Sequence, residues 1–287
     1  MSWIKPSLKA QQIIQELQIR SPSEIDIVDI AMVRGAYVKE QSLRGCEARV
    51  VRKGSQGIIT YSSSIYEEGR KRFAIAHELG HFELHKTSQM ILCSEEDMFV
   101  WKDDISQELE ANEFATEILM PEEIFIRHIK KPAQPNMETV RRLAKEFSTT
   151  LTATALRYVQ LSLEPCAIVI SKDGVIKWYK KSNSFNFHVK VRDKLSKSTY
   201  AFDYYDGLDL PDIPKKVPAD SWLSGDIDEE AEILENSVAL TSYSVILSLL
   251  WINEEVRTKY RDNEDPDREP EFDLTNPITP DGKRWRW

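Results

Sequence analysis

The stretch Arg72–His81, with the sequence RFAIAHELGH, is the most informative part of the chain. It contains His77-Glu78-x-x-His81, and residues four positions apart lie on the same face of a helix, about one turn from each other. Both imidazoles can therefore reach a single metal ion. Glu78 is rotated off the line of the two histidines, where a carboxylate can take a proton from a metal-bound water. The motif predicts two metal ligands and a general base.

The residues around the motif predict a helix from Tyr66 to near His85, buried beneath a cleft. Its other faces are apolar, and Gly80, which lacks a side chain, would let another segment approach the metal side closely. His85 lies four residues beyond His81, on the same face. Two helical turns separate it from His77, about 12 Å along the axis, so one metal cannot take all three histidines. We expect His85 to cap the end of the helix or to contact substrate.

A third ligand is expected on the next predicted helix, 105–120. Asp104 and Gln107 form a capping-box pattern at its start. The helix offers four carboxylates: Glu108, Glu110, Glu113 and Glu117. Glu110 shares its face with apolar residues and is expected to point inward, Glu113 is the second choice, and Glu108 is expected to point away. A solvent-exposed acidic helix is the alternative.

Composition restricts the class of protein. The chain has 287 residues and a net charge of −9, which argues against broad, sequence-independent binding to nucleic acids. It lacks a secretory signal and an apolar run long enough to span a membrane. Its three cysteines are widely spaced and form no C-x-x-C pair, which indicates reduced thiols and no disulfide framework. We therefore expect a cytoplasmic protein that does not associate with membranes.

Ahead of the motif, the pattern predicts two short helices, at 9–17 and 25–32, and a β-hairpin over 47–61 with a glycine-bearing turn. After the metal-site helices come two more helices, 137–147 and 151–163, joined by a tight link. They resemble a helix-turn-helix (136–163), with several basic residues nearby. Packing against the preceding domain is favoured over contact with DNA, because apolar and polar residues are mixed at the start of the second helix.

The second half of the chain changes character after Pro165. Runs at 166–171 and 175–180 flank Asp-Gly and predict a hairpin. The run at 185–189 predicts a further strand, and the run at 243–252 predicts another strand, with a buried helix as the alternative. Four aromatic residues expected at the surface are better explained by packing than by a ligand cage: Trp178, Tyr204, Tyr205 and Trp222. The segment 262–287 is rich in Pro and Asp and is expected to be disordered.

Three motifs, in this order, resemble the ImmA/IrrE family of metallopeptidases. They are Arg72–His85, the EANEFA sequence Glu110–Ala115 leading to Leu119–Pro121, and the LAKEF sequence Leu143–Phe147. The similarity spans about 13–163, and the segments 166–251 and 281–287 also look like longer members. The resemblance implies an α+β chain: a zincin-like metallopeptidase domain (1–164), with the helical pair, and a smaller β-rich α/β sensor-like or interaction domain (165–261).

The resemblance also implies a function. His77, His81 and Glu110 would be metal ligands, Glu78 the catalytic base, and the metal Zn²⁺, with Mn²⁺ as an alternative. The expected substrate is a helix-turn-helix (XRE-type) transcriptional repressor on a separate polypeptide. A second hypothesis is a non-proteolytic regulatory protein with a structural metal, which binds DNA through 136–163 or a protein partner. A third is the toxin of a toxin–antitoxin pair. The intact Glu78 favours the peptidase, because a structural site needs no base.

Overall fold

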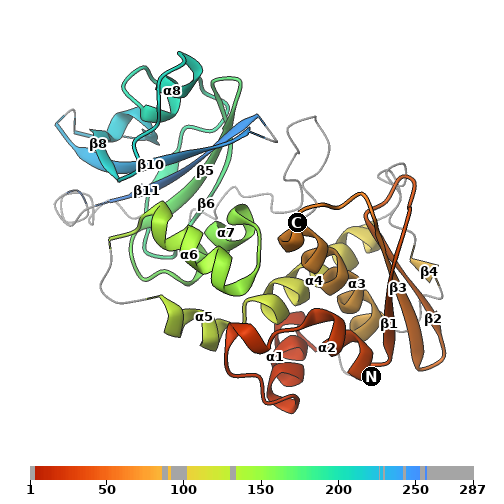
Figure 1. Cartoon of the computed structure of the whole chain (residues 1–287). Helices are drawn as coiled ribbons and strands as arrows, with labels where there is room; N and C mark the ends of the chain where they lie inside the picture. Colours follow the sequence, from red (N-terminus) through yellow and green to blue (C-terminus); the bar gives the residue numbers. More distant parts are fainter. Residues whose placement is uncertain are drawn as a thin grey trace. The chain divides into compact units, whose positions relative to one another are not determined.

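The structure is a computed structural model that describes residues 4–85, 90–91, 102–129, 134–225, 227–228, 230–241, 244–252 and 256. The chain forms two compact units (Figure 1). The first comprises residues 1–129 and 143–153, and the second 130–142 and 154–286. The units thus do not follow the predicted boundary at residue 164, because the division passes through both members of the helical pair. The segment predicted to be disordered, 262–287, lies outside the described residues.

The first unit contains a mixed four-stranded sheet in the order β1-β3-β2-β4. The strands are β1 (Ala36–Gln41), β2 (Ala48–Lys53), β3 (Gln56–Ser62) and β4 (Met90–Ile91). The predicted hairpin is confirmed as the antiparallel pair β2–β3. β1 was not predicted, and it runs parallel to β3, with Tyr37 opposite Ile58. Alternate residues of the hairpin are buried, including Val50 and Ile59, so the sheet has one covered face.

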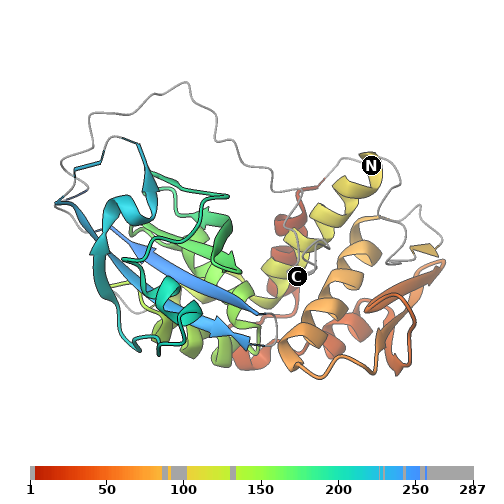
Figure 2. The same ribbon diagram turned by 90° about the horizontal axis from the view of Figure 1, so that it is seen from above.

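Five helices accompany this sheet: α1 (Pro6–Glu16), α2 (Ile27–Val33), α3 (Glu68–Leu84), α4 (Lys102–Leu119) and α5 (Glu122–His128). α3 contacts β2 and β3 on one side and α4 on the other, so it lies at the centre of the unit (Figures 1 and 2). The predicted helices are confirmed within a few residues, whereas α5 was not predicted. The capping box at Asp104 is wrong, because α4 already begins at Lys102.

α3 and α4 approach each other closely at Gly80. A Cβ atom added there would lie 3.1 Å from Ala111 Cα and 3.2 Å from the Ala111 carbonyl oxygen. Glycine costs about 1 kcal/mol relative to alanine inside a helix. Here its missing side chain allows the two backbones to come together, as the sequence predicted.

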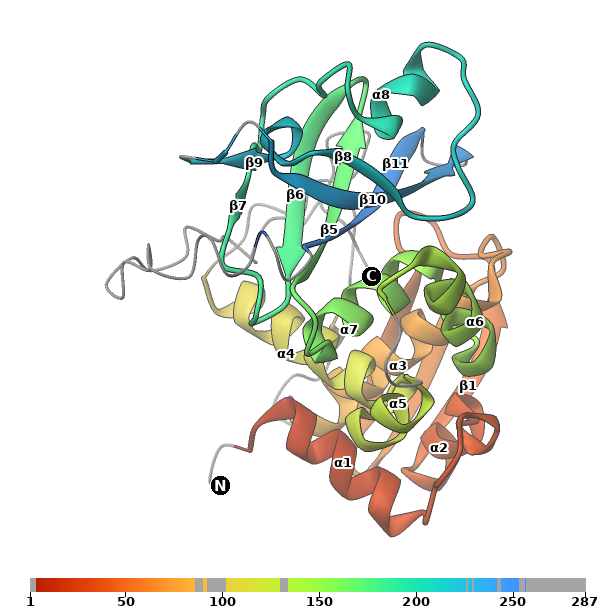
Figure 3. The same ribbon diagram turned by 90° about the vertical axis from the view of Figure 1, so that its left-hand side faces the viewer.

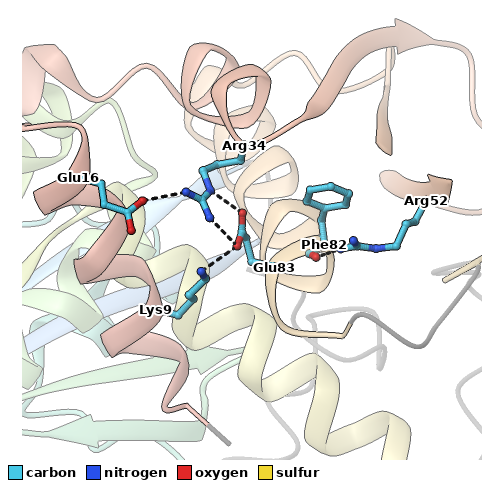
Figure 4. A network of polar contacts seen from close by, with 6 residues as sticks. All are labelled: Lys9, Glu16, Arg34, Arg52, Phe82 and Glu83. Atoms are coloured by element: carbon cyan, nitrogen blue, oxygen red, sulfur yellow. Dashed lines mark hydrogen bonds and ion pairs between the residues drawn. The ribbon is translucent and has the colours of Figure 1, made fainter. Parts of the chain in front are cut away.

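The C-terminal end of α3 is fixed by a network of charged residues (Figure 4). The Glu83 side chain is only 7% exposed, and Arg34 donates to both of its carboxylate oxygens, at 2.7 and 3.2 Å. Lys9 of α1 lies 3.1 Å from the same carboxylate. From the sheet side, Arg52 stacks on the Phe82 ring, 3.9 Å from its centroid, and donates to the Phe82 carbonyl. Charged groups from α1, from the C-terminal end of α2 and from β2 thus hold the helix that carries the motif.

The helical pair is confirmed as α6 (Met137–Phe147) and α7 (Leu151–Leu161). In α7, the polar side chains Thr152, Thr154 and Arg157 are only 9%, 0% and 4% exposed. The link between the helices packs against α3, because a Cβ atom on Gly69 would lie 2.6 Å from the Thr150 nitrogen. These side chains are not available to read base edges, which favours the packing interpretation.

The second unit is built on a five-stranded sheet in the order β6-β5-β11-β10-β8, in which all neighbouring strands are antiparallel (Figure 3). The strands are β5 (Cys166–Lys172), β6 (Val175–Lys181), β8 (Lys215–Pro218), β10 (Glu232–Leu240) and β11 (Val245–Trp251). The predicted hairpin and the strand at 243–252 are confirmed as β5–β6 and β11. The run at 185–189 forms only the short β7 (His188–Val189), which pairs with β9 (Leu223–Ser224).

A buried carboxylate connects this sheet to the short helix beside it. Glu235 of β10 accepts hydrogen bonds from the backbone nitrogen of Ala201 in α8 (Tyr200–Tyr205), at 2.6 Å, and from Trp222 Nε1, at 2.9 Å. Burial raises the pKa of Glu235, although these donors act in the opposite direction. Trp222 was predicted at the surface and is completely buried. The predicted surface position of Trp222 is therefore wrong, whereas its burial agrees with the expectation that it packs in the protein instead of forming a ligand cage.

Among the described residues, no helix is both long enough and apolar enough to cross a membrane.

Candidate metal centre

The motif helix brings His77 and His81 together as their spacing predicts. Their Nε2 atoms lie 3.0 Å apart, at the face of α3 turned toward α4. The His81 side chain is 1% exposed and the His77 side chain 14%. Two imidazole nitrogens therefore converge on one partly buried point between the helices.

The carboxylate at this point belongs to Glu108. Its Oε2 lies 3.1 Å from His77 Nε2, and its Oε1 lies 3.2 Å from His81 Nε2. One potential ligand atom from each of the three residues lies within 4.8 Å of the other two. Among the described residues this is the group of His, Cys, Asp and Glu side chains with the geometry to hold a metal.

This geometry corrects the expectation for the third ligand. Glu110 was expected to point inward and Glu108 outward, but Glu110 instead contacts His85, with its carboxylate 3.0 Å from Nε2. On a helix of 3.6 residues per turn, Glu108 lies roughly 60° from Ala111 and roughly 20° from Ala115. Both alanines are completely buried. Because α3 approaches this alanine stripe through Gly80, Glu108 faces the histidines.

The remaining two glutamates of α4 have different partners. Glu113, the second choice for the ligand, is exposed and lies 3.9 Å from Lys5. Glu117 is buried and accepts hydrogen bonds from Gln11 Nε2 at 3.0 Å and from the Glu122 nitrogen at 3.1 Å. Neither belongs to the group that contains the two histidines.

Further polar side chains contact the ring nitrogens that face away from the centre. Asn112 Oδ1 lies 2.9 Å from His77 Nδ1. His85 Nδ1 lies 3.0 Å from His81 Nδ1. His85 is the C-cap residue of α3, and its backbone N–H donates to the His81 carbonyl at 3.0 Å, as the capping prediction requires. The predicted alternative, contact with substrate, stays a prediction.

Burial and charge act against each other at these residues. Burial lowers the pKa of His77, but the adjacent Glu108 carboxylate and, more weakly, Glu78 raise it, and the net shift is upward. Burial dominates at His81 and lowers its pKa to about 4, so its ring stays neutral at pH 7. Burial would raise the pKa of Glu108, yet its close contacts with both histidines bring that pKa well below its usual value. An ionised carboxylate beside a neutral imidazole is the protonation state that metal binding requires.

The donor set fits a divalent metal such as zinc. Catalytic zinc sites commonly use three protein ligands, among them two histidines with one glutamate, and leave one position for water or substrate. Glu78, the predicted base, is only 1% exposed, and its charge contributes to the raised pKa of His77. Its catalytic role stays a prediction.

Comparison with known proteins agrees with the motifs. Residues 35–158 match the model of the IrrE N-terminal-like domain of the peptidase M78 family. This segment of the chain is therefore an IrrE-like domain. The matched segment contains β1–β3, both helices of the centre and most of the helical pair, so the resemblance to the ImmA/IrrE family is confirmed for the IrrE-like domain. The peptidase character of the family agrees with the motif.

Among solved structures, the chain resembles a transcriptional regulator from Mycobacterium tuberculosis. The TM-score is 0.56 at 14% sequence identity, and the similarity covers 94% of each chain. At this identity the likeness concerns the fold alone, and it extends beyond the IrrE-like domain into the second unit. None of the curated proteins matches the chain.

Proposed function

We propose that the chain is a metal-dependent endopeptidase whose IrrE-like domain holds Zn²⁺ through His77, His81 and Glu108. The observation that carries the proposal is the convergence of two imidazole nitrogens and one carboxylate beside Glu78. Mn²⁺ is the alternative metal. The fold proposed for this domain is zincin-like, because its motif helix lies between a mixed sheet and the helix that supplies the third ligand.

A metal held by His77, His81 and Glu108 would supply Lewis acidity and make a water at the site easier to deprotonate. Glu78 takes a proton from the water as the water oxygen attacks the peptide carbonyl carbon. The same carboxylate then gives the proton to the leaving amine as the C–N bond breaks. Glu78 is buried and lies on the same helix as both histidines.

The proposed substrate is a helix-turn-helix transcriptional repressor carried on a separate polypeptide. The match of residues 35–158 to the IrrE-like domain supports this choice. The proposed setting is the cytoplasm, where such repressors act. The second unit would receive the signal that controls cleavage, or would bind a partner.

The competing hypothesis is a regulator that binds DNA or a protein and cuts nothing. The burial of Thr152, Thr154 and Arg157 argues against DNA recognition through α7. Toxin activity within a toxin–antitoxin pair would differ from the proposal in biological role and could use the same chemistry.

Co-expression with the helix-turn-helix repressors encoded beside the gene tests the proposal, with wild type compared with Glu78→Gln. Glu113→Gln is the matched control, because it removes an exposed carboxylate on α4 that does not belong to the candidate metal centre. We expect repressor loss with wild type and Glu113→Gln, repressor survival with Glu78→Gln, and one zinc bound by all three. Mass spectrometry of the fragments then gives the cleaved bond. An intact repressor in every case, with zinc bound, would favour the non-proteolytic regulator.

A further inference from the structure

A chain of hydrogen bonds leads from the candidate metal centre to Glu110. His81 Nδ1 lies 3.0 Å from His85 Nδ1, and His85 Nε2 lies 3.0 Å from Glu110 Oε2. The side chains are 1%, 7% and 26% exposed, respectively. His85 and Glu110, which the sequence suggested as substrate contact and metal ligand, therefore form one partly buried pair behind His81.

The positions of the protons along this chain follow from its chemistry. An ionised carboxylate accepts hydrogen bonds and donates none, so Glu110 requires a proton on His85 Nε2. A neutral imidazole carries one proton, which leaves the lone pair of His85 on Nδ1. Only one proton fits between the two Nδ1 atoms, and it must come from His81. The His81 lone pair then lies on Nε2, the atom that faces His77 and Glu108. Without a metal, the Glu108 carboxylate 3.2 Å from this nitrogen favours a proton there, so Glu108 and the His85–Glu110 pair compete for the position of the single His81 proton.

The opposite arrangement would disable the centre. If His85 carried its proton on Nδ1, it would donate to His81 and force the His81 proton onto Nε2. A protonated nitrogen has no lone pair for a metal. His77 is less constrained, because the amide of Asn112 can present either its oxygen or its nitrogen to His77 Nδ1.

We propose that Glu110 and His85 are positioning residues that hold His81 in the tautomer able to bind a metal through Nε2. The inference rests on the proposed metal site and adds to it the groups that orient one ligand. Partners of this kind, behind a ligand histidine, typically contribute about 10- to 100-fold to metal affinity. Glu110 is thus expected to influence the centre through two side chains, without touching the metal.

Two measurements test the inference. Long-range ¹H–¹⁵N NMR of the metal-free full-length protein reports which nitrogen of each histidine carries the proton. Competition with a chromophoric chelator gives the zinc affinity. The variants are Glu110→Gln and His85→Phe, and the second keeps a ring of similar shape. The control is Glu146→Gln, which removes the carboxylate of another histidine pair in the same unit, 2.9 Å from His128 Nδ1.

In the wild type we expect the His81 proton on Nδ1. Both variants should populate the other tautomer and weaken zinc binding by about 10-fold or more, whereas Glu146→Gln should match the wild type. A wild-type His81 protonated on Nε2 would overturn the inference without requiring any variant to fold. So would a zinc affinity within about threefold of the wild type in both variants. Failure of the wild type to bind zinc, with His81 protonated on Nδ1, would refute the metal site and still support the hydrogen-bond chain.

Discussion

Replacement of Gly80 by alanine tests the contact that aligns the two helices of the centre. Alanine favours a helix over glycine by about 1 kcal/mol, so propensity alone predicts a more stable protein. The structure predicts the opposite. The added Cβ would lie 3.1 Å from Ala111 Cα and 3.2 Å from both the Ala111 oxygen and Phe114 Cδ1. Two of these three atoms belong to backbone, which cannot rotate away.

Overpacking of this kind costs about 1–3 kcal/mol, and the middle of this range exceeds the gain in propensity. We therefore expect Gly80→Ala to be destabilised by about 1 kcal/mol. Zinc affinity should fall as well, because any displacement of α4 at Ala111 also moves Glu108, one turn earlier on the same helix. The control is Ser106→Ala, which raises helix propensity at an exposed position of α4 without a new contact.

The assays are urea unfolding of the metal-free protein and zinc competition with a chelator. Ser106→Ala should be at least as stable as the wild type and should bind zinc equally well. A Gly80→Ala variant that gains stability and keeps full zinc affinity would show that the helices do not depend on this close approach. The contact between Gly80 and Ala111 would then not account for the inward position of Glu108.

Three further predictions concern the charged residues around the centre. Glu108→Gln should weaken zinc binding by at least about 10-fold in the chelator assay, whereas Glu113→Gln should leave it unchanged, and equal affinities would exclude Glu108 as a ligand. Glu83→Gln should lower stability in urea by about 3 kcal/mol, because it leaves Arg34 without its buried partner, and Glu16→Gln, at an exposed pair with the same arginine, should cost less than about 1 kcal/mol. Burial opposes ionisation of Glu83, but Arg34 outweighs it and holds the folded-state pKa below the ordinary 4.5. Its stabilising effect is therefore complete above pH 4.5 and is lost as the pH falls toward the folded-state pKa, so acid titrations of unfolding should show a smaller loss of stability in Glu83→Gln than in the wild type.

Local patterns predicted the elements that depend on neighbouring residues. The hairpin β2–β3, the motif helix and the pair α6–α7 follow from periodicity and turn residues within short windows. The short strands β7 and β9 and the pairing of β1 with β3 depend on partners distant in sequence. The buried environment of Trp222 likewise depends on Glu235, and no local pattern indicates it.

The sequence by itself determined His77, Glu78 and His81, because their relation is fixed by the geometry of one helix. The third carboxylate required the tertiary structure. Four glutamates on α4 were chemically equivalent candidates, and the choice depends on how α4 is rotated about its axis against α3. The close contact of Gly80 with Ala111 fixes that rotation, turns Glu108 to the histidines and leaves the neighbouring Glu110 to His85. The angular separation of Glu108 from the alanine stripe was present in the sequence, but only the packing of the two helices showed that the stripe faces the metal ligands.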